Sequence, residues 1–121
     1  IKFFILLDSK KNINEYMNAL DIHILASKFG EGFPNVVAET RLCKIPSICT
    51  DVGDAKFILG NKGWLVKVED SYSLLKALKN SIKLKTQFPI LWNKLKDDSR
   101  KRIISKYPIE KMINAYEQNW K

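Results

Sequence analysis

The sequence predicts an α/β domain: a Rossmann-like open parallel sheet with helices on both faces, followed by helices at the carboxyl end. Two observations lead to this prediction. Over residues 1–70, short apolar runs alternate with segments of helical periodicity, and parallel strands are the ones that need helical crossovers between them. The apolar runs are also nearly continuous rather than alternating, which is typical of strands covered on both faces.

Four apolar runs predict the strands. In the run at residues 21–27, His23 alternates with Ile22 and Ile24, so its side chain points to the opposite face of the strand from theirs. We therefore expect a packed or edge histidine rather than a catalytic one. The four runs are residues 2–7 ("KFFILL"), 21–27 ("DIHILAS"), 45–51 ("IPSICTD") and 63–66 ("GWLV").

Helical periodicity predicts helices between and after these strands. Asn12 is the expected N-cap of the helix at residues 12–20, and Pro34 lies near the first turn of the helix at residues 34–43. Residues 96–102, "KDDSRKR", are polar enough to predict a bend or a solvent-facing turn. The predicted helices are residues 12–20, 34–43, 53–59, 71–85, 87–107 and 108–121.

The length and composition indicate one globular domain. We expect residues 1–121 to form it, with a βα core at 1–70 and helices at 71–121. The chain opens inside a predicted strand and without an initiator methionine, as a piece of a longer protein would.

No apolar run approaches the roughly 20 residues of a membrane-spanning helix. Cys43 and Cys49 lack the spacing of metal ligands and are expected to be reduced, buried thiols of a cytoplasmic protein.

The net charge of +8 comes from the second part of the chain. Residues 71–121 contain twelve Lys and Arg against four Asp and Glu, whereas residues 1–70 contain nine of each kind. Such a basic helical surface is either a solvated face or a contact for an anionic partner, such as a membrane surface. The sequence has no known nucleic-acid recognition pattern, so nucleic acid is not expected as a partner.

The segment "EGFPNVVAE", residues 31–39, lies where a ligand is expected. It follows a predicted strand and opens a helix, and ligands of open parallel sheets collect at the carboxyl ends of the strands. Residues 32–34 offer no capping oxygen, so the first amides of the helix are predicted to be available to a phosphate, which the helix dipole favours. The alternative is an ordinary helix capped by the Asn35 side chain. The amides concerned are those of Asn35, Val36 and Val37.

The two acids of this segment suit the hydroxyl groups of a sugar. Glu31 precedes the helix and Glu39 lies inside it, and an ionised carboxylate can accept two hydroxyl hydrogen bonds at once. Their spacing, partly in a loop and partly in a helix, gives no assurance of the roughly 5 to 9.5 Å between carboxyl groups that a glycoside hydrolase needs. A hydrolytic pair is therefore not predicted.

These residues belong to a longer motif, from Ser27 to Gly63: "SKFGEGFPNVVAETRLCKIPSICTDVGDAKFILGNKG". The run resembles the donor-binding segment of retaining glycosyltransferases of family 4, which have the two-domain GT-B fold. The spaced glutamates, the "GFPN" loop, the "IP" that enters the next strand and the "TDVGD" turn carry the resemblance. The coarse pattern extends over essentially the whole chain, as the carboxyl-terminal half of such an enzyme.

The resemblance implies a role for each residue of the segment. Glu39 would hold the ribose hydroxyls of a nucleotide-sugar donor, and Glu31 would be the catalytic residue that orients the transferred sugar. The family supplies further diphosphate contacts from an upstream segment and the acceptor site from an amino-terminal domain. Both are missing from this sequence, so the piece alone is expected to be inactive, and neither a metal nor another cofactor is expected. The remaining donor-binding positions are Gly32, Phe33, Pro34, Asn35, Val36 and Val37.

The chain departs from the family pattern at Arg41 and Lys44, where an apolar residue and a glycine are common. Arg41 is expected in solvent, with a contact to the phosphates as the alternative. Lys44 is expected to lose the easy left-handed cap at a modest cost. We also expect Lys28 in solvent, with a phosphate contact as the alternative, and Asp51 as the cap of the short helix at 53–59 rather than as a donor contact.

The leading hypothesis is the donor-binding half of a retaining glycosyltransferase of the hexosyltransferase type. It would act in the cytoplasm, at the inner face of the membrane, on a glycan or lipid-linked acceptor in cell-surface polysaccharide biosynthesis. One alternative is half of a nucleotide-sugar epimerase, against which the spaced glutamates argue. The other is a non-enzymatic basic module that binds an anionic partner through residues 71–121.

Overall fold

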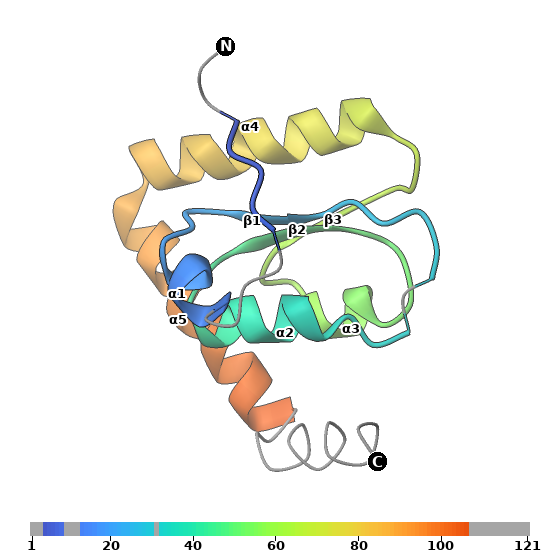
Figure 1. The fold of residues 1–121 in the computed structure, drawn as a ribbon. Helices are drawn as coiled ribbons and strands as arrows, with labels where there is room; N and C mark the ends of the chain where they lie inside the picture. The colour runs from blue at the N-terminus through green and yellow to red at the C-terminus, as the bar shows by residue number, and fades with distance from the viewer. Residues whose placement is uncertain (1–3, 9–12, 31, 107–121) are drawn as a thin grey trace.

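The computed structural model describes residues 4–8, 13–30 and 32–106, and it forms a layered α/β domain (Figure 1). Helices and strands alternate up to β3, after which two long helices follow. The strands are β1 (His23–Leu25), β2 (Ser47–Thr50) and β3 (Trp64–Val66), and the helices are α1 (Ile13–Asn18), α2 (Asn35–Leu42), α3 (Ala55–Leu59), α4 (Ser71–Gln87) and α5 (Pro89–Lys106).

The three strands form a parallel sheet in the order β1-β2-β3. Ile24 pairs with Ile48 of the central strand, and Ile48 pairs in turn with Trp64. Because all strands run in the same direction, their carboxyl ends meet at one edge of the sheet, on the right of Figure 1. The predicted fold class is confirmed.

The central strand is buried on both of its faces, as its apolar sequence predicts. Ile48 packs on the α4 side, in a cluster with Val66 and Ala77. Cys49 points to the other side, into a larger cluster formed by α2, α3 and α5. Figure 1 shows the sheet between α4 on one side and α2 and α3 on the other.

Both cysteines are free, and burial raises the pKa of the Cys49 thiol to about 12.

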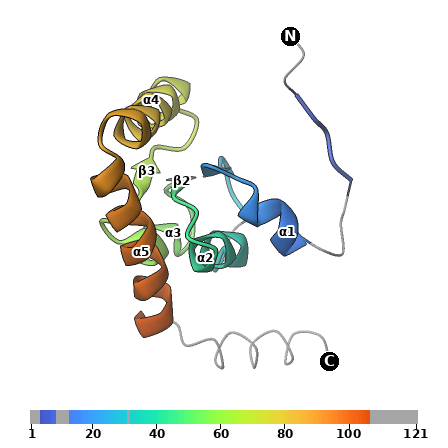
Figure 2. The same cartoon turned by 90° about the vertical axis from the view of Figure 1, so that its left-hand side faces the viewer.

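The predicted first strand is wrong in its described part. Residues 4–8 have no strand structure, and Phe4 and Leu6 are 88% and 98% exposed. Figure 2 shows this segment apart from the sheet. An apolar run becomes a strand only where a neighbouring strand satisfies its backbone groups, and the described residues provide no such neighbour for it.

The predicted bend at residues 96–102 is also wrong, because α5 continues through it. The polar residues there make contacts that suit a helix packed against the domain. Ser99 is buried and its hydroxyl donates to the carbonyl of Leu95, 2.6 Å away, while Ile103 lies fully buried one turn further on. Pro89 is tolerated because it is the first residue of the helix, where no intrahelical N–H is needed. The helix predicted at 108–121 lies outside the described residues.

The helix α2 ends in a Schellman motif in which Lys44 occupies the position usual for glycine. The N–H of Lys44 donates to the carbonyl of Arg41 and that of Ile45 to the carbonyl of Thr40, each at 3.0 Å. Lys44 has a φ of 61°. The cap therefore forms in spite of the lysine, and the expected modest cost is the strain of a lysine in the left-handed backbone, about 1 kcal/mol.

Replacing Lys44 with glycine is expected to raise the free energy of unfolding by about 0.5 to 1 kcal/mol, because glycine adopts this backbone without strain. The gain is reduced by loss of the exposed ion pair between Lys44 and Asp97, whose N–O distance is 2.9 Å. Lys44→Ala is the matched control, since it loses the same ion pair and keeps the strain. Equilibrium urea unfolding measures both variants, and a glycine variant less stable than the alanine variant would contradict this reading.

Candidate functional site

The loops that follow β1 and β2 meet at the carboxyl edge of the sheet. The N–H of Asp54 donates to the carbonyl of Gly32 at 2.9 Å and so joins the β2–α3 turn to the loop that precedes α2. Thr50, at the end of β2, donates its hydroxyl to the carbonyl of Ser27 at 2.6 Å. The two parts of the motif that are distant in sequence, "GFPN" and "TDVGD", are therefore held together.

The start of α2 has no side-chain cap. Pro34 is the N-cap residue, with φ −76° and ψ 87°, and no side chain accepts a hydrogen bond from the first turn. The alternative in which the Asn35 side chain caps the helix is therefore wrong, because Asn35 is itself the first helical residue. Pro34 is buried, and Phe33 packs against the core cluster, so the entry into the helix is anchored.

The three amides predicted to be available differ from one another. The N–H of Val37 donates to the carbonyl of Pro34 at 3.0 Å, so this part of the prediction is wrong. A tight first turn of this kind commonly satisfies one of the unpaired groups of a helix end. The N–H groups of Asn35 and Val36 have no acceptor among the described residues. Asn35 is exposed and Val36 is half-buried.

Glu39 lies one helical turn beyond Asn35 and is half-buried. Residues four apart on a helix are neighbours on the same face, about 6 Å apart, so the carboxylate of Glu39 belongs to the side of α2 that begins with Asn35. Glu31 lies outside the described residues, and its role stays a prediction. The helix α2 thus brings together one of the two acids and two unpaired amides.

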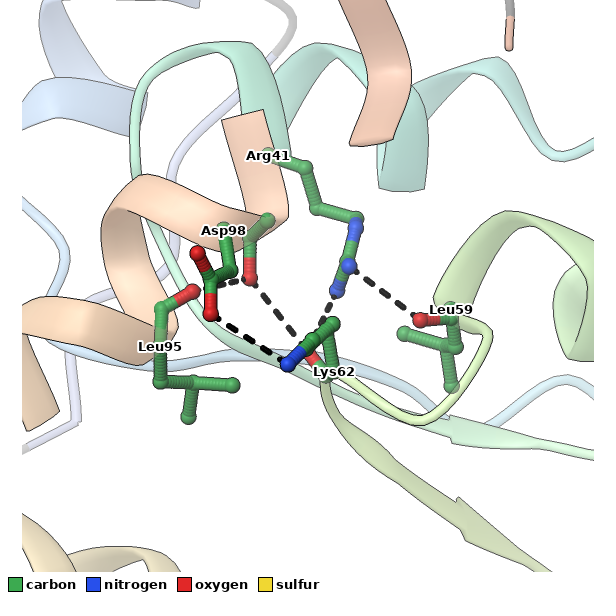
Figure 3. Close-up of polar contacts among 6 residues, drawn as sticks. Arg41, Leu59, Lys62, Leu95 and Asp98 are labelled. Atoms are coloured by element: carbon green, nitrogen blue, oxygen red, sulfur yellow. Dashed lines mark hydrogen bonds and ion pairs between the residues drawn. The ribbon is translucent and has the colours of Figure 1, made fainter. Parts of the chain in front are cut away.

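Arg41, two residues beyond Glu39, points away from the carboxyl edge of the sheet and contacts the α3–β3 turn instead. It is fully buried, so both of its predicted positions, in solvent and near the phosphates, are wrong. Its guanidinium donates to the carbonyls of Lys62 at 2.9 Å and Leu59 at 3.2 Å, in the turn between α3 and β3 (Figure 3). Burial lowers the pKa of Arg41 to about 10. Its length lets it reach the α3–β3 turn, which precedes β3 and therefore lies at the opposite end of the parallel sheet from the carboxyl edge.

The other residues singled out in the sequence have structural contacts. The Nδ1 atom of His23 lies 3.4 Å from the Ser47 hydroxyl, and burial lowers the histidine pKa, which suits a packed residue of the edge strand. Asp54 rather than Asp51 is the N-cap residue of α3, so the expected role of Asp51 is wrong. The N–H of Asp51 donates instead to the carbonyl of Val66, which extends the pairing between β2 and β3 by one residue.

A depression of about 280 Å³ lies at the same edge, on the α4 side of the sheet. The sequence has no motif for this depression, and the feature that predicts it is that all three strands end at this edge. Lys28 is exposed, as expected, but forms an ion pair with Glu69, which joins the loops after β1 and β3. The lining includes Ala26, Thr50, Val66, Lys67, Glu69 and Leu74.

The described part of the chain contains no group of three or more His, Cys, Asp or Glu side chains that could hold a metal ion. It also contains no helix with the length and apolar character needed to cross a bilayer. The expectation that the site works without a metal stays a prediction.

The chain is similar to known glycosyltransferases in sequence and in fold. A family model described as glycosyl transferases group 1 matches residues 2–83. A protein of Bacillus subtilis (strain 168) named for teichuronic acid biosynthesis, the glycosyltransferase TuaC, is 34% identical over 67 residues. The match covers 54% of this chain and 17% of that protein, so the chain spans less than a fifth of this relative.

Solved structures show the same fold at low sequence identity. A glycosyltransferase from Rickettsia africae ESF-5 has a TM-score of 0.74 at 22% identity over 92% of this chain and 29% of its own. Sucrose-phosphate synthase from Thermosynechococcus elongatus has a TM-score of 0.68 at 24% identity over 87% of this chain and 27% of its own.

A third solved structure is itself a separate domain. It is the C-terminal domain of the group 1 glycosyl transferase LpcC from Francisella tularensis, with a TM-score of 0.65 at 24% identity, and the match covers 86% of this chain and 52% of that domain. A match over residues 2–83 includes both the sheet and the start of α2. The chain therefore belongs to the glycosyl transferases group 1 family, and its fold is one half of the GT-B architecture.

Proposed function

We propose that this chain is the donor-binding half of a retaining glycosyltransferase that moves a hexosyl group from a nucleotide-sugar to an acceptor. The observation that carries the proposal is the uncapped start of α2 at the carboxyl edge of the sheet, where Asn35 and Val36 have N–H groups without acceptors among the described residues. The positive end of the helix dipole lies at the same place, and together these features favour a diphosphate.

The contacts around α2 support a fixed rather than adaptable phosphate position. The Asp54–Gly32 hydrogen bond and the buried Pro34 hold the approach to the helix from both sides. Donors that are already oriented stabilise negative charge without reorganising when it develops, as it does on a departing nucleoside diphosphate. The amides would therefore contribute to leaving-group stabilisation as well as to binding.

The carboxylates complete the donor site on this proposal. Glu39 accepts hydrogen bonds from the ribose hydroxyls, one helical turn from the phosphates. Glu31 orients the transferred sugar as the catalytic residue, next to the backbone of Gly32, Phe33 and Pro34. Bonds to an ionised carboxylate each contribute about 1.5 to 3 kcal/mol net. The site needs no metal, because amide dipoles and the further contacts of the full-length protein balance the diphosphate charge.

The complete enzyme would include an amino-terminal domain that carries the acceptor site, so this chain alone would bind donor weakly and transfer nothing. On this proposal residues 1–121 are one domain, with a βα core at 1–70 and helices at 71–121. The teichuronic acid role in the name of the Bacillus relative favours cell-surface polysaccharide biosynthesis. The acceptor would then be a glycan or lipid-linked saccharide, met at the cytoplasmic face of the membrane.

Asn35→Pro tests the proposed phosphate contact by removing a single N–H. Proline is well tolerated as the first helical residue, and the Asn35 side chain is exposed, so the fold is expected to persist. We expect the variant to bind nucleoside diphosphates about tenfold more weakly, because one charge-assisted hydrogen bond is lost. Ligand-observed NMR titration of the 121-residue chain at millimolar ligand measures the effect.

Asn35→Ala is the matched control, since it removes the side chain and keeps the N–H. It is expected to bind nucleoside diphosphates within about twofold of the unchanged chain. Uridine and guanosine without phosphates serve as reference ligands, and Asn35→Pro should leave their weak binding unchanged. Equal affinity of the proline and alanine variants for the diphosphates would contradict the proposal.

A further inference from the structure

A basic depression lies at the other end of the domain from the candidate donor site. Its volume is about 390 Å³, and it is formed by the turn between α3 and β3 and by the second half of α5. In Figure 1, α5 descends at the left, whereas the carboxyl ends of the strands lie at the right. The charged residues that line the depression are Lys62, Asp98, Lys101, Arg102 and Lys106.

Two of these cations are held in place by the fold. Arg102 donates from Nη2 to the carbonyl of Phe57 at 2.6 Å and from Nε to the carbonyl of Ile58 at 3.3 Å. Its guanidinium also covers Gly60, where an added Cβ would come within 2.5 Å of the Arg102 Cζ atom. Lys62 reaches Asp98 across the turn, with an N–O distance of 3.2 Å (Figure 3). One wall of the depression is therefore positioned before any ligand arrives.

The remaining two cations lie at its open side. Lys101 and Lys106 are exposed and form no ion pair with another described residue. Among the described residues of the lining, the acid is Asp98, and it is already paired with Lys62. The depression thus presents three further positive charges, on Lys101, Arg102 and Lys106, around a space larger than one phosphate group.

We propose that this basic depression is a second anion site, which binds the phosphate groups of a ligand distinct from the sugar donor. The fixed guanidinium gives directed donors, and the two flexible lysines add charge at the rim, a combination that suits phosphate oxygens. The site is open and faces away from the donor edge, so it can accept a phosphate that belongs to a larger molecule. The inference does not rest on the proposed transferase activity.

The test compares two double variants of equal charge in the full 121-residue chain. Lys101→Gln with Lys106→Gln removes the rim of the depression, and Lys79→Gln with Lys83→Gln removes two exposed lysines of α4 as the control. One arm titrates inorganic pyrophosphate at about 0.15 M salt and follows the amide resonances of residues 61, 62 and 101–106. The other measures binding to phosphatidylcholine vesicles with and without phosphatidylglycerol.

The rim variant is expected to lose at least about tenfold in affinity, and the control variant less than about threefold. A loss in the pyrophosphate arm alone supports a free phosphate ligand, a loss in the vesicle arm alone supports a lipid headgroup, and a loss in both supports phosphate from either source. The proposal is overturned if neither ligand binds, or if both double variants lose affinity equally. Asn35→Pro should leave these resonances unchanged, so the result is independent of the donor site.

Discussion

Replacing Arg41 with alanine is expected to lower the free energy of unfolding by about 3 kcal/mol. The side chain is fully buried between α2 and the α3–β3 turn, and its removal leaves a cavity in a region that cannot collapse freely. Truncation of a large buried side chain to alanine typically costs 2 to 5 kcal/mol. Gly63 beside it shows how closely the turn is packed, since a Cβ there would lie 2.9 Å from the carbonyl oxygen of Ser47.

Arg41→Met is expected to change the stability by less than about 1 kcal/mol, or to increase it. Methionine fills most of the space, and the Leu59 carbonyl that Arg41 contacts keeps another donor, the Lys62 N–H. The Lys62 carbonyl lies 3.3 Å from the Ser99 hydroxyl, whose single hydrogen it shares with the closer carbonyl of Leu95. Burial of the guanidinium is itself unfavourable. A pKa lowered to about 10 corresponds to a cost on the order of 3 kcal/mol. The Nε atom also has no partner in the described part of the chain.

Equilibrium urea unfolding of the unchanged chain, Arg41→Ala and Arg41→Met measures these changes in the free energy of unfolding. A methionine variant as unstable as the alanine variant would contradict this account, because it would mean that the charge-assisted bonds, rather than the filled volume, stabilise the turn. In either case the variants should bind nucleoside diphosphates as the unchanged chain does, since the Arg41 guanidinium contacts the α3–β3 turn and not the start of α2.

Glu39→Gln is expected to weaken the binding of a nucleoside diphosphate by about tenfold or more. Glutamine keeps the length of the side chain and loses the charge that strengthens two hydroxyl contacts, each of about 1.5 to 3 kcal/mol when charge-assisted. The loss should disappear with a 2′,3′-dideoxynucleoside diphosphate, which has no ribose diol. Ligand-observed NMR with both ligands gives the comparison.

Glu15→Gln on the exposed face of α1 is the control for the change in net charge, and it should leave the affinity for both ligands unchanged. Thermal unfolding of each variant checks that the fold is retained. Equal losses for the diol and dideoxy ligands would show that Glu39 acts on the position of α2 rather than on the ribose, and the proposed role would be wrong.

The fold could be predicted where sequence pattern and tertiary contacts agree. The apolar runs at 21–27, 45–51 and 63–66 became β1, β2 and β3 because each has a neighbouring strand to pair with, and helices cover both faces of the central strand. The run at 2–7 has the same composition, and its described part is not a strand. Composition gives the tendency of a segment to form a strand, whereas the presence of a pairing partner is a property of the whole fold.

The site could be predicted in part for the same reason. The missing side-chain cap of α2 is a local feature, visible in the absence of Ser, Thr, Asp or Asn immediately before Asn35. The use of the Val37 N–H within the first turn depends on backbone angles that the sequence does not give. The burial of Arg41 could not be predicted, because a charged residue is rarely fully buried and here depends on hydrogen bonds to the carbonyls of the distant α3–β3 turn.

The most direct measurement of the central claim follows the backbone amide resonances of the 121-residue chain as a nucleoside diphosphate is added. The account predicts the largest changes at Asn35 and Val36, whose N–H groups lack acceptors among the described residues, and smaller ones at Val37, which already donates to Pro34. No change at Asn35 and Val36 at millimolar ligand, or changes confined to the basic depression on α5, would contradict it.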